Sequence, residues 1–321
     1  MTPAIAFVAL AIERLFGYPK FMQAIMGHPV EWMGALIGWF EKNQNISARP
    51  ASERRIAGTL MLILVMAISC LIALFVTVLI NELPNGWFIE AIIASVFLSQ
   101  RQLAQTVRNV ADGLDISLAR GREAVGHIVG RDTKNLDEAE VSRAAIETLA
   151  ENASDGVIAP LFWLLIFGLP GIVVYKAINT ADSMVGHFSN RYTDFGWASA
   201  KVDDIVNWIP ARITAGFIVL AAIIMPGASG GDAWSAARCD GPKHNSPNAG
   251  WPEAAMAGAL SFGLGGPRKY DGKTTDLPKM GVGSRDLTSR DIRRALVLFA
   301  ATGGVAFALT GAIAVLTFIP A

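Results

Sequence analysis

Long apolar runs alternate with polar segments along the chain, and they predict helices that cross a bilayer. The longest run, Ile56 to Ile80, carries no charged residue and exceeds the roughly 20 residues that a spanning helix needs. A second charge-free run, Ala295 to Ala321, ends the sequence. Weaker candidates, short or broken by Gly, Pro or a charge, are Met1 to Phe16, Trp87 to Leu98, Val157 to Ile178 and Ile209 to Met225. The pattern predicts an all-α, polytopic integral membrane protein with about four to six spans.

Composition agrees with this fold class, since 52% of the residues are hydrophobic and only 17% are charged. Glu13 and Arg14 end the first apolar stretch, and no positive segment precedes it, so we expect a retained anchor rather than a cleaved signal. The two cysteines, Cys70 and Cys239, are too few for a disulfide framework or a cysteine zinc site. The 27 basic and 27 acidic residues cancel, which gives no electrostatic reason to expect a nucleic-acid partner.

The distribution of basic residues predicts an orientation. Arg49, Arg54 and Arg55 precede the first strong span, whereas the turn after it, residues 81–86, has no Lys or Arg. Because cytoplasmic segments are enriched in Lys and Arg, we expect this turn to face away from the cytoplasm.

The same rule predicts two large cytoplasmic segments. A helical segment at about 100–155 is rich in arginine, and a Gly- and Pro-rich loop at about 227–294 leads into the last span, 295–321. The loop composition favours irregular structure over a second packed domain. We therefore expect residues 1–321 to form a single membrane-embedded domain, multi-pass in the cytoplasmic (inner) membrane.

The polar stretch 129–160 contains the clearest helix signal. Asp137 followed by Glu140 is typical of a capping box, and Gly156 is a plausible stop, which predicts a helix from about Glu138 to Ser154.

Three carboxylates recur at steps of four along this helix and share one broad face: Glu147, Glu151 and Asp155. One explanation is a solvated face paired with Arg143 or Arg131. The other is a Mg²⁺ site, in which the carboxylates act together with substrate phosphates.

Two further carboxylate and amide clusters flank the same hydrophobic hairpin. Their members have helical spacing and are Asn179, Asp182 and Ser183 in one, and Asp203, Asp204 and Asn207 in the other. A helix cap or a surface turn could explain either alone, but three clusters together favour a shared site.

Arg212 and two histidines are further candidates. Pro210 suits the first turn of an apolar helix, and Arg212 then lies where helix N-termini attract phosphate. His28 and His244 occupy polar, turn-rich contexts where function is plausible.

Six segments carry a resemblance to a known family. They are HPVEWMG from His28, VGRDT from Val129, AAIETLAENASDGVIAPLFW from Ala144, YKAINTADSM from Tyr175, DDIVNWIPARITA from Asp203 and HNSPNAGWPEAAMAGAL from His244. In this order they resemble the adenosylcobinamide-phosphate synthase family of cobalamin biosynthesis, membrane proteins of the CbiB/CobD type. The resemblance covers nearly the whole chain.

The resemblance implies an ATP-dependent amide ligation. The free carboxylate of the corrinoid adenosylcobyric acid would join the amine of aminopropanol phosphate, or of ethanolamine phosphate as in some relatives, to give adenosylcobinamide phosphate. It implies ATP as co-substrate, Mg²⁺, and contact with the lipid bilayer. A homo-oligomer, or association with other cobalamin-assembly enzymes, is compatible with it.

Residues and resemblance together predict the site. The catalytic candidates are Glu147, Glu151, Asp155, Asp182 and, as base for the amine, His244. The candidate metal ligands are Glu147, Glu151, Asp182, Asp203 and Asp204. Substrate or phosphate binding is expected of Arg131, Asp132, Asn152, Asn179, Ser183, Asn207, Arg212, His28, Asn245 and Asn248.

The chain departs from the family pattern at two places. Near the N-terminus it has Glu13 and then Gly17-Tyr18-Pro19, where such proteins commonly have an aspartate and then Gly-Asp-Pro. Lys201 stands where arginine is common.

The break at Gly168 to Gly171 suggests a broken or re-entrant hairpin, which we expect to return the three clusters to one polar cavity at the cytoplasmic face. Two other functions stay open at this point. One is an intramembrane Mg²⁺-dependent prenyl or phosphoalcohol transferase, because paired acids such as Asp203 and Asp204 suit diphosphate. The other is a non-enzymatic membrane regulatory protein on the same scaffold.

Overall fold

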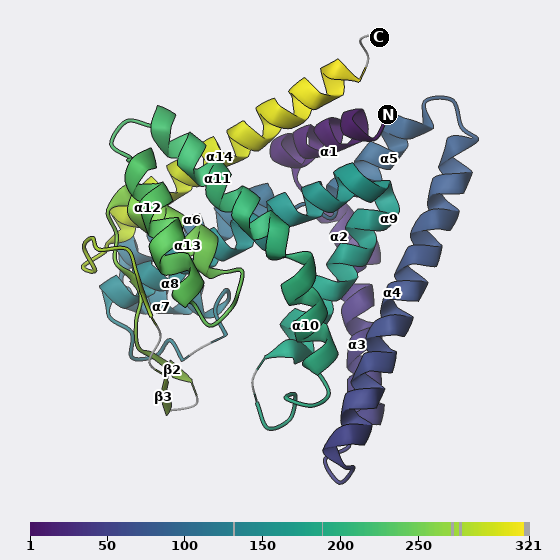
Figure 1. Ribbon diagram of the computed structural model, residues 1–321, viewed down its shortest axis with the longest axis horizontal. Helices are drawn as coiled ribbons and strands as arrows, with labels where there is room; N and C mark the ends of the chain where they lie inside the picture. The colour runs from purple at the N-terminus through teal and green to yellow at the C-terminus, as the bar shows by residue number, and fades with distance from the viewer. Residues whose placement is uncertain (131, 188, 271–272, 276–277, 318–321) are drawn as a thin grey trace. The chain divides into compact units, whose positions relative to one another are not determined.

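The computed structural model describes residues 1–130, 132–187, 189–270, 273–275 and 278–317, and most of this part of the chain is helical (Figure 1). The chain divides into two compact units. Unit 1 comprises Met1–Ser99, Ala159–Asn207 and Thr310–Ala321, and unit 2 comprises Gln100–Ile158 and Trp208–Leu309. Each unit is described by itself.

Unit 1 contains the longest predicted span. Its elements are α1 (Thr2–Phe16), α2 (Lys20–Met26), α3 (Pro29–Gln44), α4 (Ala51–Asn81), α5 (Gly86–Ser95), α9 (Ala159–Ala181), the π-helical turn η2 (Asp182–Gly186) and α10 (Trp197–Val206). Helix α4 confirms the helix expected over Ile56 to Ile80, and α3, α9 and α10 pack along it (Figure 1).

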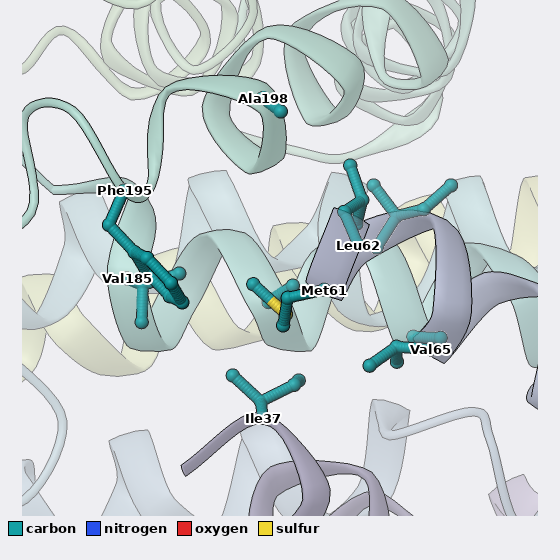
Figure 2. Packing of buried hydrophobic residues seen from close by; sticks show 10 residues of the cluster. Ile37, Met61, Leu62, Val65, Val185, Phe195 and Ala198 are labelled. Atoms are coloured by element: carbon teal, nitrogen blue, oxygen red, sulfur yellow. The ribbon is translucent and has the colours of Figure 1, made fainter. Parts of the chain in front are cut away.

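A buried cluster joins these elements. Figure 2 shows Ile37 of α3 facing Met61 and Val65 of α4, with Val185 and Phe195 beside them. All five side chains are at most 1% exposed, which is the close packing expected of a protein interior.

The packing around Phe195 requires a glycine on α4. A Cβ atom added at Gly58 would overlap the Phe195 carbonyl group. Glycine at this position therefore lets the loop before α10 lie directly on α4.

Helix α9 is broken where the sequence predicted a break. Gly168 has φ 64° and ψ −153°, a conformation that favours glycine, and Pro170 follows inside the helix. The break frees the Leu169 amide, which donates to Oε1 of buried Glu90 on α5 at 3.4 Å.

Unit 2 contains the polar helix and the last span. Its elements are α6 (Gln100–Ile116), α7 (Leu118–Gly126), α8 (Glu138–Ala153), the π-helical turn η1 (Ser154–Ile158), α11 (Trp208–Ile224), α12 (Gly230–Asp240), the 3₁₀ turn η3 (Gly241–Lys243), α13 (Gly250–Leu260), the short strands β1 (Leu264–Gly265), β2 (Arg268–Tyr270), β3 (Lys273–Thr275) and β4 (Lys279–Met280), and most of α14 (Ser289–Leu316). Strand β1 pairs antiparallel with β4, and β2 with β3.

The start of α8 confirms the predicted capping box. Asp137 Oδ1 accepts from the Glu140 amide at 2.7 Å, and the Glu140 carboxylate accepts from the Asp137 amide at 2.9 Å. The predicted stop at Gly156 is wrong, because the backbone widens into η1 and continues as α9.

The expectation of an irregular loop at 227–294 is wrong for much of its length. Helices α12 and α13 pack against each other and against α11. Small residues make this possible: a Cβ at Gly258 would overlap the Asp232 carbonyl group, so α13 needs glycine there to approach α12.

Three helical stretches are long and apolar enough to cross a membrane, and a bent pair raises the count to four. The three are Ala51–Asn81, Glu138–Gly186 and Ser289–Leu316, and the pair is Trp197–Val206 with Trp208–Ile224. These apolar helices of the described chain indicate a multi-pass α-helical membrane protein and support the lower end of the predicted count.

Candidate functional site

Unit 1 brings two of the predicted polar clusters together around Asp203. Asn207 Nδ2 donates to Asp203 Oδ2 at 2.9 Å, and Asn179 Nδ2 donates to Asp203 Oδ1 at 3.4 Å. Tyr175 and Lys176 extend this network: the Tyr175 hydroxyl donates to Asn207 Oδ1 at 2.9 Å, and Lys176 Nζ to Asn179 Oδ1 at 3.5 Å. We call these five residues the Asp203 cluster.

Local structure explains the geometry of the Asp203 cluster. Asp203 and Asn207 are four residues apart, and Asn207 is the C-terminal cap of α10, so their side chains meet on one face. Because Asn207 Oδ1 accepts from Tyr175, its amide nitrogen is turned toward Asp203. Asp203 is 8% exposed and Asn207 1%, so these bonds hold a carboxylate in place inside the protein.

Asp204 and Asp182, the two remaining predicted acids of unit 1, lie beside this cluster. Asp204 lies 3.8 Å from Lys201 Nζ in an ion pair. Asp182 begins η2, which packs against α10, and a Cβ at Gly186 would overlap its carboxylate. The Ser183 hydroxyl donates to the Asn179 carbonyl, one helical turn earlier, at 2.8 Å.

A second buried carboxylate, Glu147, organises part of unit 2. Glu147 Oε1 accepts from the Gly265 amide of β1 at 2.7 Å, and Glu147 is 5% exposed. Arg285 donates to the carbonyls of Gly263, Leu264 and Gly265 at 3.3, 3.1 and 2.8 Å, and Arg143 donates to the Arg285 carbonyl at 2.5 Å. We call Arg143, Glu147, Gly265 and Arg285 the Glu147 cluster.

The charges of the Glu147 cluster shift the pKa of Arg285 in opposite directions. Burial, and then the positive charge of Arg143, lower the pKa of Arg285, while the charge of Glu147 opposes the shift. The half-buried Arg285 guanidinium donates to three carbonyl groups and lies near the Glu147 charge, so this cluster holds the short strand β1 against α8.

The remaining α8 candidates have different surroundings. Glu151 is exposed, and Asn152 donates to the Thr148 carbonyl at 3.0 Å. Asp155 lies in η1, where the π-helical path alters the expected α-helical phase. Asp132 is exposed, and the predicted Arg131 lies outside the described residues.

Arg212 is held between two indole rings. Its guanidinium carbon is 4.2 Å from the Trp208 ring centroid and 4.6 Å from that of Trp251. It donates to the Trp208 carbonyl at 2.7 Å, to Asn248 Oδ1 at 3.3 Å and to the Pro247 carbonyl at 3.3 Å. Arg212 therefore fixes the loop before α13 to α11.

The same loop contains His244. Its Nδ1 accepts from the Ser246 amide at 3.0 Å, and its Nε2 lies 3.9 Å from Oε1 of Glu253, which is 2% exposed. Nε2 is thus the nitrogen left for proton transfer if His244 is the base. Asn245, next to it, is exposed.

His28 is a helix cap in unit 1. Its Nδ1 accepts from the Val30 amide at 3.2 Å, and Nε2 donates to the Val96 carbonyl at 3.1 Å. The Tyr18 ring packs edge-on against it, with ring centroids 4.7 Å apart. Burial is the main reason that the pKa of His28 is lowered.

The arrangement of the acids also bears on metal binding. Within the described part of the chain, no group of three or more His, Cys, Asp or Glu side chains is arranged to hold a metal ion. Mg²⁺ is commonly held by one or two carboxylates together with substrate phosphates, which fits Asp203 with a neighbouring acid.

Tyr175 and Lys176 of the Asp203 cluster, and Arg143, Gly265 and Arg285 of the Glu147 cluster, are not among the predicted site residues. Tyr175 and Lys176 precede Asn179 by one helical turn, so their spacing could have revealed them. Arg285 could not be found this way, because it meets residues far away in the sequence.

The fold and these clusters define a helical membrane protein whose buried acids are held by amides and arginines. The profile of the family described as "CobD/Cbib protein" matches residues 6–299, and the chain belongs to this family.

Named relatives agree over almost the entire chain. The "Cobalamin biosynthesis protein CobD" of Brucella suis biovar 1 (strain 1330) is 46% identical over 92% of this chain and 91% of its own length. The proteins of that name from Rhodobacter capsulatus and Rhizobium meliloti (strain 1021) are 44% and 42% identical, over 92% and 96% of both chains. No solved structure matches the chain. The family membership places the protein in cobalamin (vitamin B12) biosynthesis.

Proposed function

We propose that this protein is an adenosylcobinamide-phosphate synthase, which joins adenosylcobyric acid to aminopropanol phosphate in an ATP- and Mg²⁺-dependent amide ligation. The observation that carries the proposal is the match, over nearly the whole chain, to relatives named for cobalamin biosynthesis. Ethanolamine phosphate is the alternative amine.

The chemistry explains why acids and cations would be needed together. A carboxylate is a poor acceptor for an amine, so the corrinoid carboxylate first takes the γ-phosphoryl group of ATP, and ADP leaves. The amine nitrogen then forms the C–N bond, the C–O bond to phosphate breaks, and the amine loses a proton. Such phosphoryl transfer relies on positioning and on neutralisation of negative charge.

The Asp203 cluster supports the proposed neutralisation of the negative charge on ATP. When bound, Mg²⁺ would neutralise the nucleotide phosphates, and Asp203, Asp204 and Asp182 are the first choice among the proposed ligands. Asn179 and Asn207 hold the Asp203 carboxylate in one orientation, and Lys176 adds a positive charge beside it.

Unit 2 offers the other proposed groups. Glu147 and Glu151 remain candidate ligands, and Arg212 with Asn248 is the proposed anion-binding pair. His244 is the proposed base through Nε2. We further propose that these groups act on the cytoplasmic side of the inner membrane.

The test is product formation by purified protein. Detergent-solubilised protein with Mg²⁺-ATP, adenosylcobyric acid and aminopropanol phosphate should yield adenosylcobinamide phosphate, detected by mass. A parallel reaction with ethanolamine phosphate defines the preferred amine, and omission of ATP or Mg²⁺ should abolish product. Absence of product, where the Rhodobacter capsulatus relative forms it under the same conditions, would overturn the proposal.

A further inference from the structure

A groove in unit 1 lies at the positive end of the longest span. It has a volume of about 380 Å³, and its lining residues come from the first turns of α4 and the start of α10: Ser52, Arg55, Ile56, Thr59, Leu60 and Trp197. This volume is in the range of small-molecule sites. The charge-free stretch of α4 begins at Ile56, so the groove lies where the helix would enter the hydrocarbon region.

Two adjacent arginines at this end of α4 differ in their partners. Arg54 forms an ion pair with Asp194. The Arg55 guanidinium instead stacks over the Trp197 ring, with its carbon 3.7 Å from the ring centroid. Among the residues that the structure describes, Arg55 has no carboxylate partner, so its charge in the groove is not neutralised by the protein.

Stacking on the Trp197 ring leaves the N–H groups of Arg55 able to bind a phosphate group. One face of the guanidinium covers the indole ring, while its N–H groups point outward along the edges of the plane, where they can bind two phosphate oxygens. Ser52 lines the same groove, and its hydroxyl can donate a further hydrogen bond, whereas the Thr59 hydroxyl already donates to the Arg55 carbonyl at 2.8 Å.

The other half of the groove is apolar and exposed. Ile56 is 61% exposed, Leu60 54% and Trp197 41%. Tryptophan is enriched at the level of lipid headgroups, and an acyl chain can lie along exposed aliphatic side chains. A phosphate-binding end and an apolar end, in this order along α4, match the order of headgroup and chain in a bilayer.

We propose that this groove binds an anionic phospholipid, with the lipid phosphate on Arg55 and an acyl chain along Ile56 and Leu60. The Arg55 charge in the groove favours an anionic over a zwitterionic headgroup, because Arg54 beside it is already paired with Asp194. The groove involves none of the proposed catalytic residues, so the lipid would support the position of α4 and α10 and would not take part in the ligation.

The test compares lipid binding by full-length variants in detergent, with native mass spectrometry as the readout. The wild-type protein should retain phosphatidylglycerol more tightly than phosphatidylcholine. Arg55→Gln, which removes the charge, should weaken phosphatidylglycerol binding about tenfold. Arg49→Gln is the matched control, because it removes the same charge from the same end of the protein outside the groove, and it should bind within about twofold of wild type.

A second variant tests the apolar half. Leu60→Trp fills the groove without changing charge and should also weaken binding of phosphatidylglycerol, while thermal unfolding shows that each variant is folded. Equal binding by Arg55→Gln and wild type, or an equal loss in Arg49→Gln, would overturn the proposal. So would inorganic phosphate that displaces the lipid at an equal concentration, because the groove would then be a site for free phosphate.

Discussion

The Asp203 cluster and the Glu147 cluster each bury one carboxylate, but they satisfy it differently. Asp203 accepts from two side-chain amides, and these amides are in turn bonded to Tyr175 and Lys176. Glu147 accepts from a main-chain amide of β1, and Arg285 beside it donates to main-chain carbonyls.

This difference in partners distinguishes a structural role of a buried acid from a ligand-binding role. Main-chain partners tie distant segments of the chain together, which is a structural role. The side-chain amides around Asp203 also join α9 to α10, but the cost of ordering and burying them with a carboxylate must be offset, and a ligand for the carboxylate is a reason to retain them. Burial alone would not distinguish the two clusters.

The largest expected effect is loss of activity in Asp203→Asn. The substitution keeps the shape but removes the charge and sets an NH2 group against the amide of Asn179 or Asn207, so we expect product formation to fall at least about 100-fold and the free energy of unfolding by about 1 kcal/mol. Glu53→Gln, which neutralises an exposed acid outside both clusters, is the control and should keep wild-type activity. Full activity in Asp203→Asn would show that the Asp203 charge is not needed for the reaction, and the two clusters would then not differ in function.

A smaller effect is expected for Tyr175→Phe. Without the hydroxyl, Asn207 Oδ1 loses its donor and only Asp203 orients the Asn207 amide, so product formation should fall about tenfold, while the free energy of unfolding falls by about 1 kcal/mol. Activity and denaturant unfolding measured on the same preparation check both numbers. A loss of stability with unchanged activity would make Tyr175 a packing residue only.

Glu147 should instead show a stability effect. Glu147→Leu leaves the Gly265 amide unsatisfied and should lower the free energy of unfolding by about 2 kcal/mol, whereas the amide oxygen in Glu147→Gln still accepts and should restore most of it. The activity of Glu147→Gln also tests the predicted metal role, which requires a charge. If its activity falls as far as that of Asp203→Asn, both clusters serve the reaction.

The smallest effect concerns His28, whose partners are main-chain groups. The lowered pKa means that the unfolded chain takes up a proton near pH 6.5 while the folded chain resists it. The contribution of His28 to stability is therefore complete above this pH and is lost as the pH falls. His28→Asn keeps a cap acceptor but does not titrate, so we expect a weaker loss of stability between about pH 7 and pH 5. An unchanged pH dependence would assign that loss to other groups.

Local signals in the sequence predicted much of the fold. The capping box at Asp137, the break at Gly168 and the charge-free helix of α4 are all confirmed, because each depends on neighbouring residues alone. The helical spacing of Asp203 and Asn207 also predicted their contact correctly.

What the sequence did not predict depends on long-range contacts. The bond between Glu147 and Gly265 joins residues 118 positions apart, and nothing near Glu147 indicates it. Helices α12 and α13 were missed because their glycines suggested a loop, while in the structure those glycines allow close helix packing. Whether the three clusters meet in one cavity stays a prediction.

The two π-helical turns, η1 and η2, bear on how the chain tolerates changes in length. Each π turn contains one residue more than the α-helical path requires, so deleting one residue from Ser154–Ile158 would allow a regular α-helix to form. Because the wide turn takes up the extra residue, such a deletion would leave the helical phase of the residues on either side of the turn nearly unchanged. A single-residue deletion in the regular part of α9 before Gly168 has no extra residue to remove and would turn the residues up to that break by about 100°, so it should be more damaging than a deletion within Ser154–Ile158.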